Sequence, residues 1–121
     1  MKRHEIGILG ERVAATYLKN NGYEIVETNY RCPSGEIDII ARTADTLVFV
    51  EVRTKTSSLY GSPEESITRT KMKHLLAVAD DFIVNRPGLP ENRRIDVIGV
   101  RLDPDGQLSS INHIKNAVEG A

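Results

Sequence analysis

The sequence of 121 residues is poor in the residues on which several classes of protein depend. A single cysteine, Cys32, excludes an internal disulfide and a multi-cysteine zinc site, and it suits a reducing compartment. With no tryptophan, two phenylalanines and four tyrosines, the chain has few side chains for stacking single-stranded bases. It shows no Gly-rich phosphate loop and no Ser-His-Asp or Cys-His pattern. These absences argue against P-loop enzymes and nucleophile-based hydrolases.

A strong charge of either sign is also absent. Lys and Arg number 16 and Asp and Glu number 17, so the net charge is −1 and any site for a polyanion must come from a local cluster. No run approaches the ~18 apolar residues of a membrane span. The first residues, MKRHEIGILGERVA, show no signal-peptide pattern. We expect a cytoplasmic protein without membrane contact, built as one domain over residues 1–121.

The hydrophobic periodicity predicts a helix, three strands, a second helix and two further strands. The helices are expected over 4–21 and 63–85, and the strands over 23–31, 36–42, 46–54, 93–102 and 108–114. Gly7 and Gly10 interrupt the first helix and are expected to allow close packing. Ser62 and Glu65 are expected to form a capping box for the second helix, with Pro63 at its first helical position. This αβββαββ order predicts an α/β layered domain with a mixed sheet.

Residues 35–55, GEIDIIARTADTLVFVEVRTK, form two apolar strands that each contain one carboxylate. A tight hairpin would place Asp38 opposite Glu51, with Cβ atoms ~4.5–5.5 Å apart. Like charges at that distance destabilise the pair unless a cation lies between them. Two convergent carboxylates suit a hard divalent cation, Mg²⁺ or Mn²⁺. The alternative is a structural ion pair with Arg53 or Lys55, which the spacing alone favours equally.

The two-residue period of the strands assigns side chains to the two faces of the sheet. One face is expected to be apolar throughout, with Ile37, Ile39, Ala41, Val48, Val50 and Val52. The other is expected to carry both carboxylates beside Ile40, Leu47 and Phe49. Glu36 would then face Arg53. We infer a sheet covered on both sides, with a polar pocket at one end.

The ordered set of these motifs resembles a known family. Asp38 followed by Glu51-x-Arg53 resembles the PD-(D/E)xK nuclease core, and GEIDII and VFVEVR, with GERVAATYL before and RRIDVI after, are similar to the YraN-like family of predicted endonucleases. The resemblance covers nearly the whole chain. It implies a restriction-endonuclease-like αβββαβ core and an endonuclease that requires Mg²⁺ or Mn²⁺ to hydrolyse DNA, with branched DNA as one candidate. Cutting two strands calls for two active sites, which is consistent with a homodimer.

The resemblance also assigns the metal ligands. It implies that Asp38 and Glu51 are catalytic and hold the metal, with the carbonyl of Val52 as a third oxygen. Glu11 matches an acidic residue of the first helix that adds to the metal site. On the helical wheel Glu11 lies at the margin of the buried stripe, so a solvated helix carboxylate is the alternative.

Basic residues near the carboxylates are candidates for catalysis and for phosphate contacts. Arg53 stands where the superfamily has lysine, and it stays protonated, so it stabilises charge but is a poor base. Lys55 lies two residues on and could substitute for the lysine. Lys71, beside the buried stripe of the second helix, either meets phosphate in the pocket or covers apolar surface. Arg94 and Asp96 are expected to pair with each other as a structural feature.

Three functions are compatible with the sequence. The first is the endonuclease, and the second is a non-catalytic nucleic-acid-binding module, which the missing lysine favours. The third is a protein-interaction domain on the same fold, which the near-neutral charge favours. Metal-dependent cleavage distinguishes the first from the others, and the salt dependence of DNA binding distinguishes the second from the third.

Overall fold

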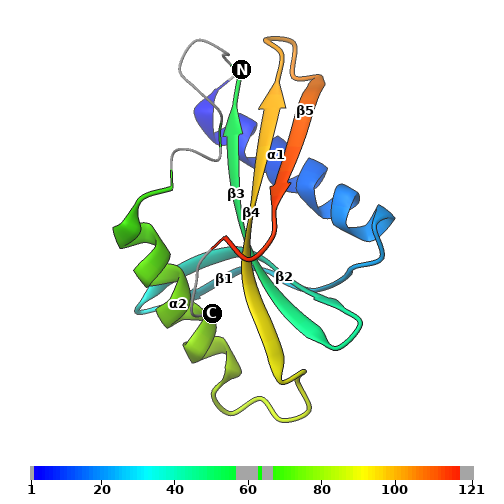
Figure 1. The fold of residues 1–121 in the computed structure, drawn as a ribbon. Helices are drawn as coiled ribbons and strands as arrows, with labels where there is room; N and C mark the ends of the chain where they lie inside the picture. Colours follow the sequence, from blue (N-terminus) through cyan, green and yellow to red (C-terminus); the bar gives the residue numbers. More distant parts are fainter. Residues whose placement is uncertain (1, 57–62, 64–66, 118–121) are drawn as a thin grey trace.

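One mixed sheet with a helix on each face makes up the computed structural model, which describes residues 2–56, 63 and 67–117 (Figure 1). The strand order is β1-β2-β3-β4-β5; β3 and β4 are parallel and the other neighbours antiparallel. The elements are α1 (Arg3–Asn20), β1 (Glu24–Cys32), β2 (Gly35–Thr43), β3 (Thr46–Lys55), α2 (Arg69–Ile83), β4 (Asn92–Leu102) and β5 (Leu108–Ile114). The predicted α/β class, element order and mixed sheet are confirmed.

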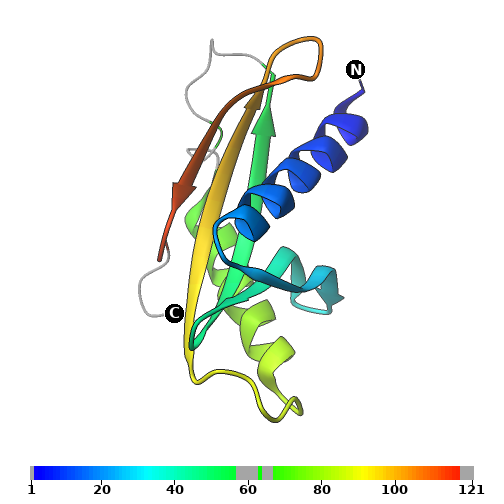
Figure 2. The ribbon, with the colours of Figure 1, turned by 90° about the vertical axis from the view of Figure 1, so that its right-hand side faces the viewer.

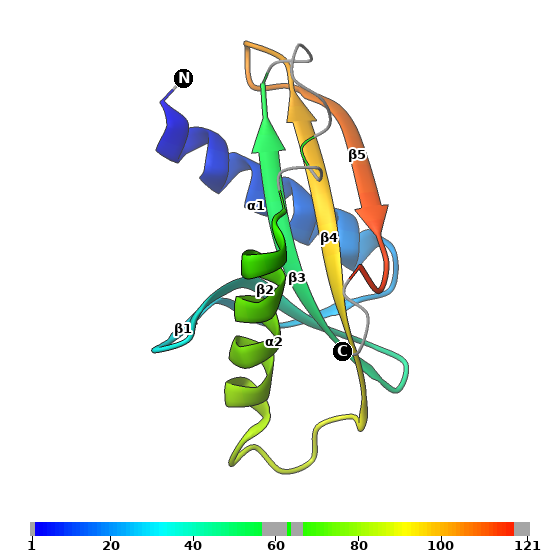
Figure 3. The ribbon, with the colours of Figure 1, turned by 60° about the vertical axis from the view of Figure 1, so that its left-hand side comes forward.

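The two helices cover opposite faces of the sheet (Figures 2 and 3). On one face, Ala14 and Leu18 of α1 pack with Ile39, Val50 and other residues of the sheet. On the other face, α2 packs its buried stripe of Leu75, Val78, Ala79 and Phe82. Each helix buries residues at helical spacing, so its periodicity predicted its buried side. None of the helices in the described part of the chain is long and apolar enough to cross a bilayer.

The hairpin of β2 and β3 has the predicted register. Thr43 pairs with Thr46 beside the turn, and the ladder ends at Ile39 opposite Val50, just before the two carboxylates. Beyond that point β2 stays paired with β1 as far as Gly35. Strands β1 and β2 twist away from the direction of β3 and β4 (Figure 3). One edge of β3 is therefore released from β2 where the carboxylates lie.

The start of α2 differs from the prediction. Ile67 and Thr68 are not helical, and the helix begins at Arg69. The side chain of Thr68 accepts a hydrogen bond from the backbone N–H of Lys71 at 3.1 Å and caps the helix. Threonine at this position satisfies one of the free N–H groups of the first turn, as the expected serine would have done. The predicted cap at Ser62 lies outside the described residues.

Gly10 allows α1 to approach β3 closely, as predicted. A Cβ atom at Gly10 would lie 1.9 Å from the hydroxyl oxygen of Thr54 and 2.8 Å from its Cβ, whereas a Cβ at Gly7 would meet no atom within 4 Å. We expect Gly7→Ala to raise the free energy of unfolding by up to about 1 kcal/mol, because alanine favours helix. Gly10→Ala makes the same gain but overlaps Thr54, at a cost of about 1–3 kcal/mol or more.

Chemical denaturation of the two variants measures this difference. The pair is matched because both changes add one methyl group to the same helix. A similar rise in stability for both variants would show that α1 can move away from β3 without loss, and close packing at Gly10 would be wrong.

Candidate functional site

The alternation of side chains along β2 breaks at Asp38. Ile39 packs on the α1 face with Ala41, Val48 and Val50, as their predicted common face requires. Ile37 packs on the α2 face, so its predicted place on the same face is wrong. The Asp38 carboxylate accepts the backbone N–H of Val52 at 2.8 Å. This side chain binds the backbone edge of β3 that the end of the β2–β3 ladder leaves open. The twist of β2 that releases this edge also rotates Ile37 to the other face.

Asp38 and Glu51 lie side by side at this point. Glu51 is buried, with 4% of its surface exposed, and Asp38 is half-buried. Burial, followed by the negative charge of Glu51, raises the pKa of Asp38 to about 7, although the hydrogen bond from Val52 opposes the shift. Two carboxylates this close favour a shared proton or a cation. The predicted convergence of the two strands on a carboxylate pair is therefore present.

Two basic side chains contact Glu51. Nζ of Lys71, from the first turn of α2, lies 3.4 Å from Glu51 Oε2, and a guanidinium nitrogen of Arg53 lies 3.4 Å from the same oxygen. The expected pairing of Arg53 with Glu36 is wrong, because Glu36 instead pairs with Arg31 of β1. Nε of Arg53 is buried and has no hydrogen-bond partner among the described residues. An unpaired buried donor of this kind is costly unless an acceptor reaches it.

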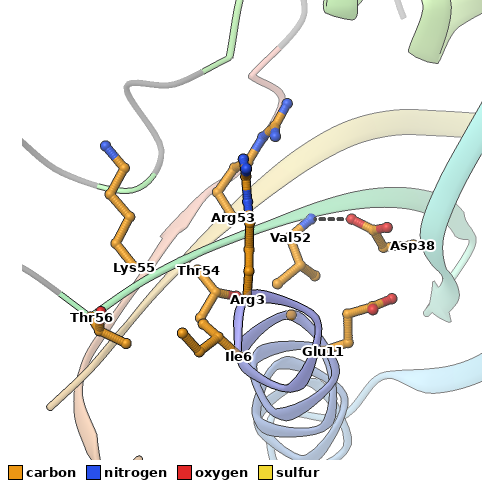
Figure 4. A pocket seen from close by; sticks show the side chains of 10 residues that line it. Arg3, Ile6, Glu11, Asp38, Val52, Arg53, Thr54, Lys55 and Thr56 are labelled. Atoms are coloured by element: carbon orange, nitrogen blue, oxygen red, sulfur yellow. Dashed lines mark hydrogen bonds between the residues drawn. The ribbon is translucent and has the colours of Figure 1, made fainter. Parts of the chain in front are cut away.

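A hollow of about 610 Å³ opens beside the carboxylates, between α1 and the released edge of β3 (Figure 4). Its lining residues are Arg3, Ile6, Gly7, Glu11, Asp38, Val52, Arg53, Thr54, Lys55 and Thr56. Figure 4 shows Arg53 and Lys55 pointing away from α1, on the same side of β3. The structure thus brings Asp38, Val52, Arg53 and Lys55 to one hollow, which Glu51 and Lys71 flank on the α2 face.

Glu11 lies in the wall of this hollow, at the margin of α1. Asn29 of β1 donates a hydrogen bond of 2.7 Å to its carboxylate. Burial raises the pKa of Glu11, the hydrogen bond from Asn29 opposes this, and the charges of Asp38 and Glu36 raise it further. Within the residues that the structure describes, no group of three or more His, Cys, Asp or Glu is arranged to hold a metal. Glu11 as a metal ligand therefore stays a prediction, and the paired carboxylates form the candidate centre.

The donor atoms present fit a hard divalent cation. Mg²⁺ is commonly held by one or two carboxylates together with waters. Asp38 and Glu51 supply two carboxylates. A residue of a β-strand points its C=O to the same side as its N–H, so the carbonyl of Val52 lies on the edge that faces Asp38. This oxygen set suits Mg²⁺ or Mn²⁺ better than softer metals.

Sequence reasoning missed a second polar cluster on the α1 face. Asp96 is fully buried and pairs with Arg94 at 2.9 Å, as predicted, but it also contacts Nε2 of His113 at 2.7 Å. Nδ1 of His113 meets the hydroxyl of Tyr17 at 3.1 Å, and Arg94 donates to the hydroxyl of Tyr23 at 2.7 Å. The contact of His113 with Asp96 depends on the pairing of β4 with β5, which the sequence does not show. We define these five residues as the Asp96 network.

Asn29 is a further residue that the sequence did not single out. Its φ angle of 52° lies in the left-handed region, which asparagine tolerates better than most residues. Asn29 lies within the continuous strand β1, and its side chain reaches Glu11 of α1 from there. The sequence offered one sign that this position is unusual, because asparagine is uncommon inside a strand.

The raised pKa of Asp38 predicts how stability depends on pH. The folded state favours the protonated form, so this contribution is complete below about pH 4 and is lost as the pH rises through about 7. Asp38→Asn keeps an acceptor for Val52 and removes the titration. Relative to this variant, the parent should lose on the order of 1–4 kcal/mol between pH 4 and 8, at about 1.36 kcal/mol per unit.

Urea denaturation in EDTA at several pH values measures this loss. Glu91→Gln, which changes an exposed carboxylate in the loop before β4, serves as the control and should follow the parent. Parallel curves for the parent and Asp38→Asn would contradict the placement of Asp38 beside Glu51.

Comparison with known proteins extends over nearly the whole chain. The model of a family described as "Uncharacterised protein family UPF0102" matches residues 10–100. A "UPF0102 protein" of Caldicellulosiruptor saccharolyticus is 44% identical over 117 residues, which cover 97% of this chain and 99% of that protein. Another, of Geobacter metallireducens, is 42% identical over 114 residues, with 94% and 92% covered. A third, of Roseiflexus castenholzii, is 44% identical over 122 residues, with 99% and 98% covered.

Proposed function

Because the chain belongs to the uncharacterised protein family UPF0102, whose description names no activity, we propose its function from the site itself. The protein is a metal-dependent endonuclease that hydrolyses phosphodiester bonds of DNA, with branched DNA as one candidate substrate. Membership of the family confirms the YraN-like resemblance of the sequence. The PD-(D/E)xK nuclease superfamily, the metal and the substrate are part of our proposal.

The observation that carries the proposal is the carboxylate pair and its surroundings. Asp38 and Glu51 converge where β2 leaves β3, and the pKa of Asp38 rises to about 7 because burial and Glu51 disfavour its charge. A purely structural ion pair would lower that pKa, because a cation favours the charged form. Lys71 and Arg53 contact Glu51 rather than Asp38. Both cations contact Glu51, whereas Asp38 accepts the backbone N–H of Val52, and this arrangement favours a cation site beside Asp38 over a structural ion pair.

Each residue of the site has a role in such a reaction. Asp38, Glu51 and the carbonyl of Val52 would hold the divalent cation, which when bound polarises a phosphodiester and lowers the pKa of a water. Lys71 and Arg53 are placed to neutralise the charge that develops on the phosphate oxygens. The buried Nε of Arg53 is a donor that a phosphate oxygen would satisfy. Lys55, further along β3, lies close enough to the hollow to bind the next phosphate.

Cleavage assays test this function directly. The purified chain is incubated with labelled linear, nicked, forked and four-way-junction DNA in Mg²⁺, in Mn²⁺ and in EDTA. We expect cleavage that requires the metal and is faster on some branched forms. Absence of cleavage of every substrate in both metals would contradict the endonuclease.

Variants of Arg53 test whether the missing lysine impairs catalysis. Arg53 contacts Glu51 on its own strand, so we expect it to act as a fixed positive charge and the reaction to need no protein base. Arg53→Lys should then cleave no faster than the parent, and Arg53→Ala should cleave more slowly. Single-turnover rates across a pH series measure this. A marked gain for the lysine variant would show that a base is missing in the parent.

A specific observation favours the second candidate, a non-catalytic nucleic-acid-binding module. Glu51 is already paired with both Lys71 and Arg53, so a metal cation at the site must compete with an ammonium and a guanidinium group. DNA binding with a steep salt dependence, but without cleavage, would support this module. Absence of DNA binding would instead favour the protein-interaction domain.

A further inference from the structure

A second hollow adjoins the one beside β3. It has a volume of about 230 Å³, lies between α1 and the strands β1 and β2, and has Asn29 of β1 in its wall. Glu11 and Asp38 line both hollows, so these two carboxylates lie where the hollows meet. A side chain with open space on two sides is poorly fixed by packing. The direction of the Glu11 carboxylate therefore depends on its hydrogen bonds.

Asn29 provides a hydrogen bond that fixes Glu11. The side-chain amide of Asn29 donates to the carboxylate of Glu11 at 2.7 Å, from β1 to α1. The amide is neutral, so it orients the carboxylate without adding a positive charge. A lysine or an arginine at this position would neutralise Glu11 and compete with a metal cation. A neutral donor is therefore the kind of partner that suits a cation site.

The register of β1 and β2 places Asn29 next to the carboxylate pair. Thr28, the residue before Asn29, pairs with Ile39, the residue after Asp38. Asn29 therefore lies opposite Asp38 in this antiparallel ladder. Figure 4 shows the side chain of Glu11 extending from α1 on the side where Asp38 lies. The amide of Asn29 thus holds the Glu11 carboxylate beside that of Asp38.

The backbone of Asn29 is unusual for a strand. Its φ angle of 52° lies in the left-handed region, which residues other than glycine rarely adopt. In the described part of the chain, the other non-glycine residues with positive φ are Ala44, Asn85 and Asn116, and each lies in a turn. Asn29 instead lies within β1, so a turn does not account for its conformation. Strained residues of this kind cluster at functional sites.

Each carboxylate around the centre has a hydrogen-bond or ion-pair partner. The backbone N–H of Val52 binds Asp38, two basic side chains bind Glu51, and the amide of Asn29 binds Glu11. Outer hydrogen bonds of this kind typically fix the groups that hold a metal. Glu11 adds a third negative charge beside the pair, and that charge attracts a cation even without direct contact.

We propose that Asn29 is a positioning residue of the cation site, whose amide holds the carboxylate of Glu11 beside Asp38. This inference rests on the function proposed above, because it concerns the cation of that same site. Without the amide, the Glu11 carboxylate turns freely between the two hollows, and the cation is bound more weakly. Asn29 is exposed, so its loss affects the cation more than it affects folding.

The test measures the binding of Mn²⁺ alone, without DNA, from the electron paramagnetic resonance signal of the free ion. Asn29→Gly removes the amide, and glycine accepts the positive φ angle without strain. This variant should raise the dissociation constant of Mn²⁺ about tenfold, the lower end of the effect of residues that support metal ligands. Urea denaturation verifies that the variant is folded. Loss of stability with an unchanged dissociation constant would mean a purely structural role and would overturn the inference.

Asn116→Gly is the matched control. Asn116 is exposed, has the same φ angle of 52°, and lies in the turn after β5, away from the two hollows. The hydrogen bond from Asn116 to Asp96 comes from its backbone N–H, which glycine keeps. The control should change the dissociation constant of Mn²⁺ less than twofold. An equal rise for both variants would overturn the positioning role of Asn29.

A double-mutant cycle tests whether Asn29 acts through Glu11. Glu11→Gln removes the charge and should weaken Mn²⁺ binding at least as much as Asn29→Gly does. Adding Asn29→Gly to Glu11→Gln should then weaken binding less than twofold further, because the group that the amide positions is already neutral. A further tenfold loss, or no effect of Glu11→Gln, would overturn the inference.

The outcomes separate this inference from the proposed function. If the parent cleaves DNA with Mn²⁺ but Asn29→Gly binds Mn²⁺ as the parent does, the positioning role is wrong and the endonuclease stands. If Mn²⁺ binding depends on Asn29 through Glu11 but no DNA substrate is cleaved in either metal, the positioning role stands and the endonuclease is wrong. Absence of Mn²⁺ binding by the parent overturns the positioning role.

Discussion

Replacing Asp38 by Asn and Glu51 by Gln in the same chain should abolish both metal binding and cleavage. A ligand that binds only the folded state stabilises it, by about 2.7 kcal/mol at 100 times its dissociation constant. Mg²⁺ or Mn²⁺ should therefore raise the unfolding midpoint of the parent, and the double variant should show no rise. The substitutions keep the size of the side chains but remove the two charged oxygen ligands, so DNA cleavage should fall to background.

A second double variant controls for the loss of two negative charges. Asp80→Asn with Asp81→Asn removes the same charge from adjacent positions of α2, and it should keep the metal response and the cleavage of the parent. Thermal unfolding with and without metal, and single-turnover cleavage, are the measurements. An equal metal response in the parent and in the Asp38–Glu51 variant would place the metal elsewhere.

Asp96→Ala should lower the free energy of unfolding by about 3–5 kcal/mol, because it removes one partner of a buried ion pair. The carboxylate of Asp96 is fully buried and accepts from Arg94, from His113 and from the backbone N–H of Asn116. Without this carboxylate, Arg94 keeps its charge in a half-buried position. The contact from β4 to His113 of β5 and the hydrogen bond from the Asn116 N–H are also lost. The total free energy of unfolding of a natural domain is about 5–15 kcal/mol, so much of the stability depends on Asp96.

Asp80→Ala is the matched control for this change. Asp80 also pairs with an arginine of β4, Arg93, at 3.3 Å, but 69% of its side chain is exposed. An exposed pair of this kind contributes about 0–1 kcal/mol. Urea denaturation of the two variants should give clearly different losses. A loss below about 1 kcal/mol for Asp96→Ala would show that the Asp96 network adds little to stability.

The pKa of Asp96 predicts a second signature of the same network. Burial raises it, but the hydrogen bonds from His113, Arg94 and Asn116 outweigh burial and hold the pKa below its usual value. This contribution is therefore complete above about pH 4 and is lost as the pH falls through the lower pKa of the folded state. Asp96→Asn should flatten the loss of stability of the parent below pH 4. The range differs from that of Asp38, whose effect lies between about pH 4 and 7.

Local patterns in the sequence predicted the helices and strands and the carboxylate pair of the site. The two-residue period of β2 and β3 and the short turn between them determined the hairpin register, and so brought Asp38 close to Glu51. The 3.6-residue period identified the buried sides of both helices, and Gly10 indicated close packing. These features depend on residues near one another in the chain. The prediction of Ile37 failed where β2 twists away from β3, because an ideal strand period contains no twist.

Contacts between distant segments were decided by the tertiary structure alone. Lys71 reaches Glu51 because a parallel crossover lays α2 across one face of the sheet, and Lys55 faces Arg101 because that crossover sets the β3–β4 register. His113 reaches Asp96 only through the offset of β4 and β5. A periodic pattern specifies which side of an element is buried, but it does not specify how far that element slides against a partner. That offset depends on loop geometry and on packing across the whole sheet, and it decides which charged side chains meet.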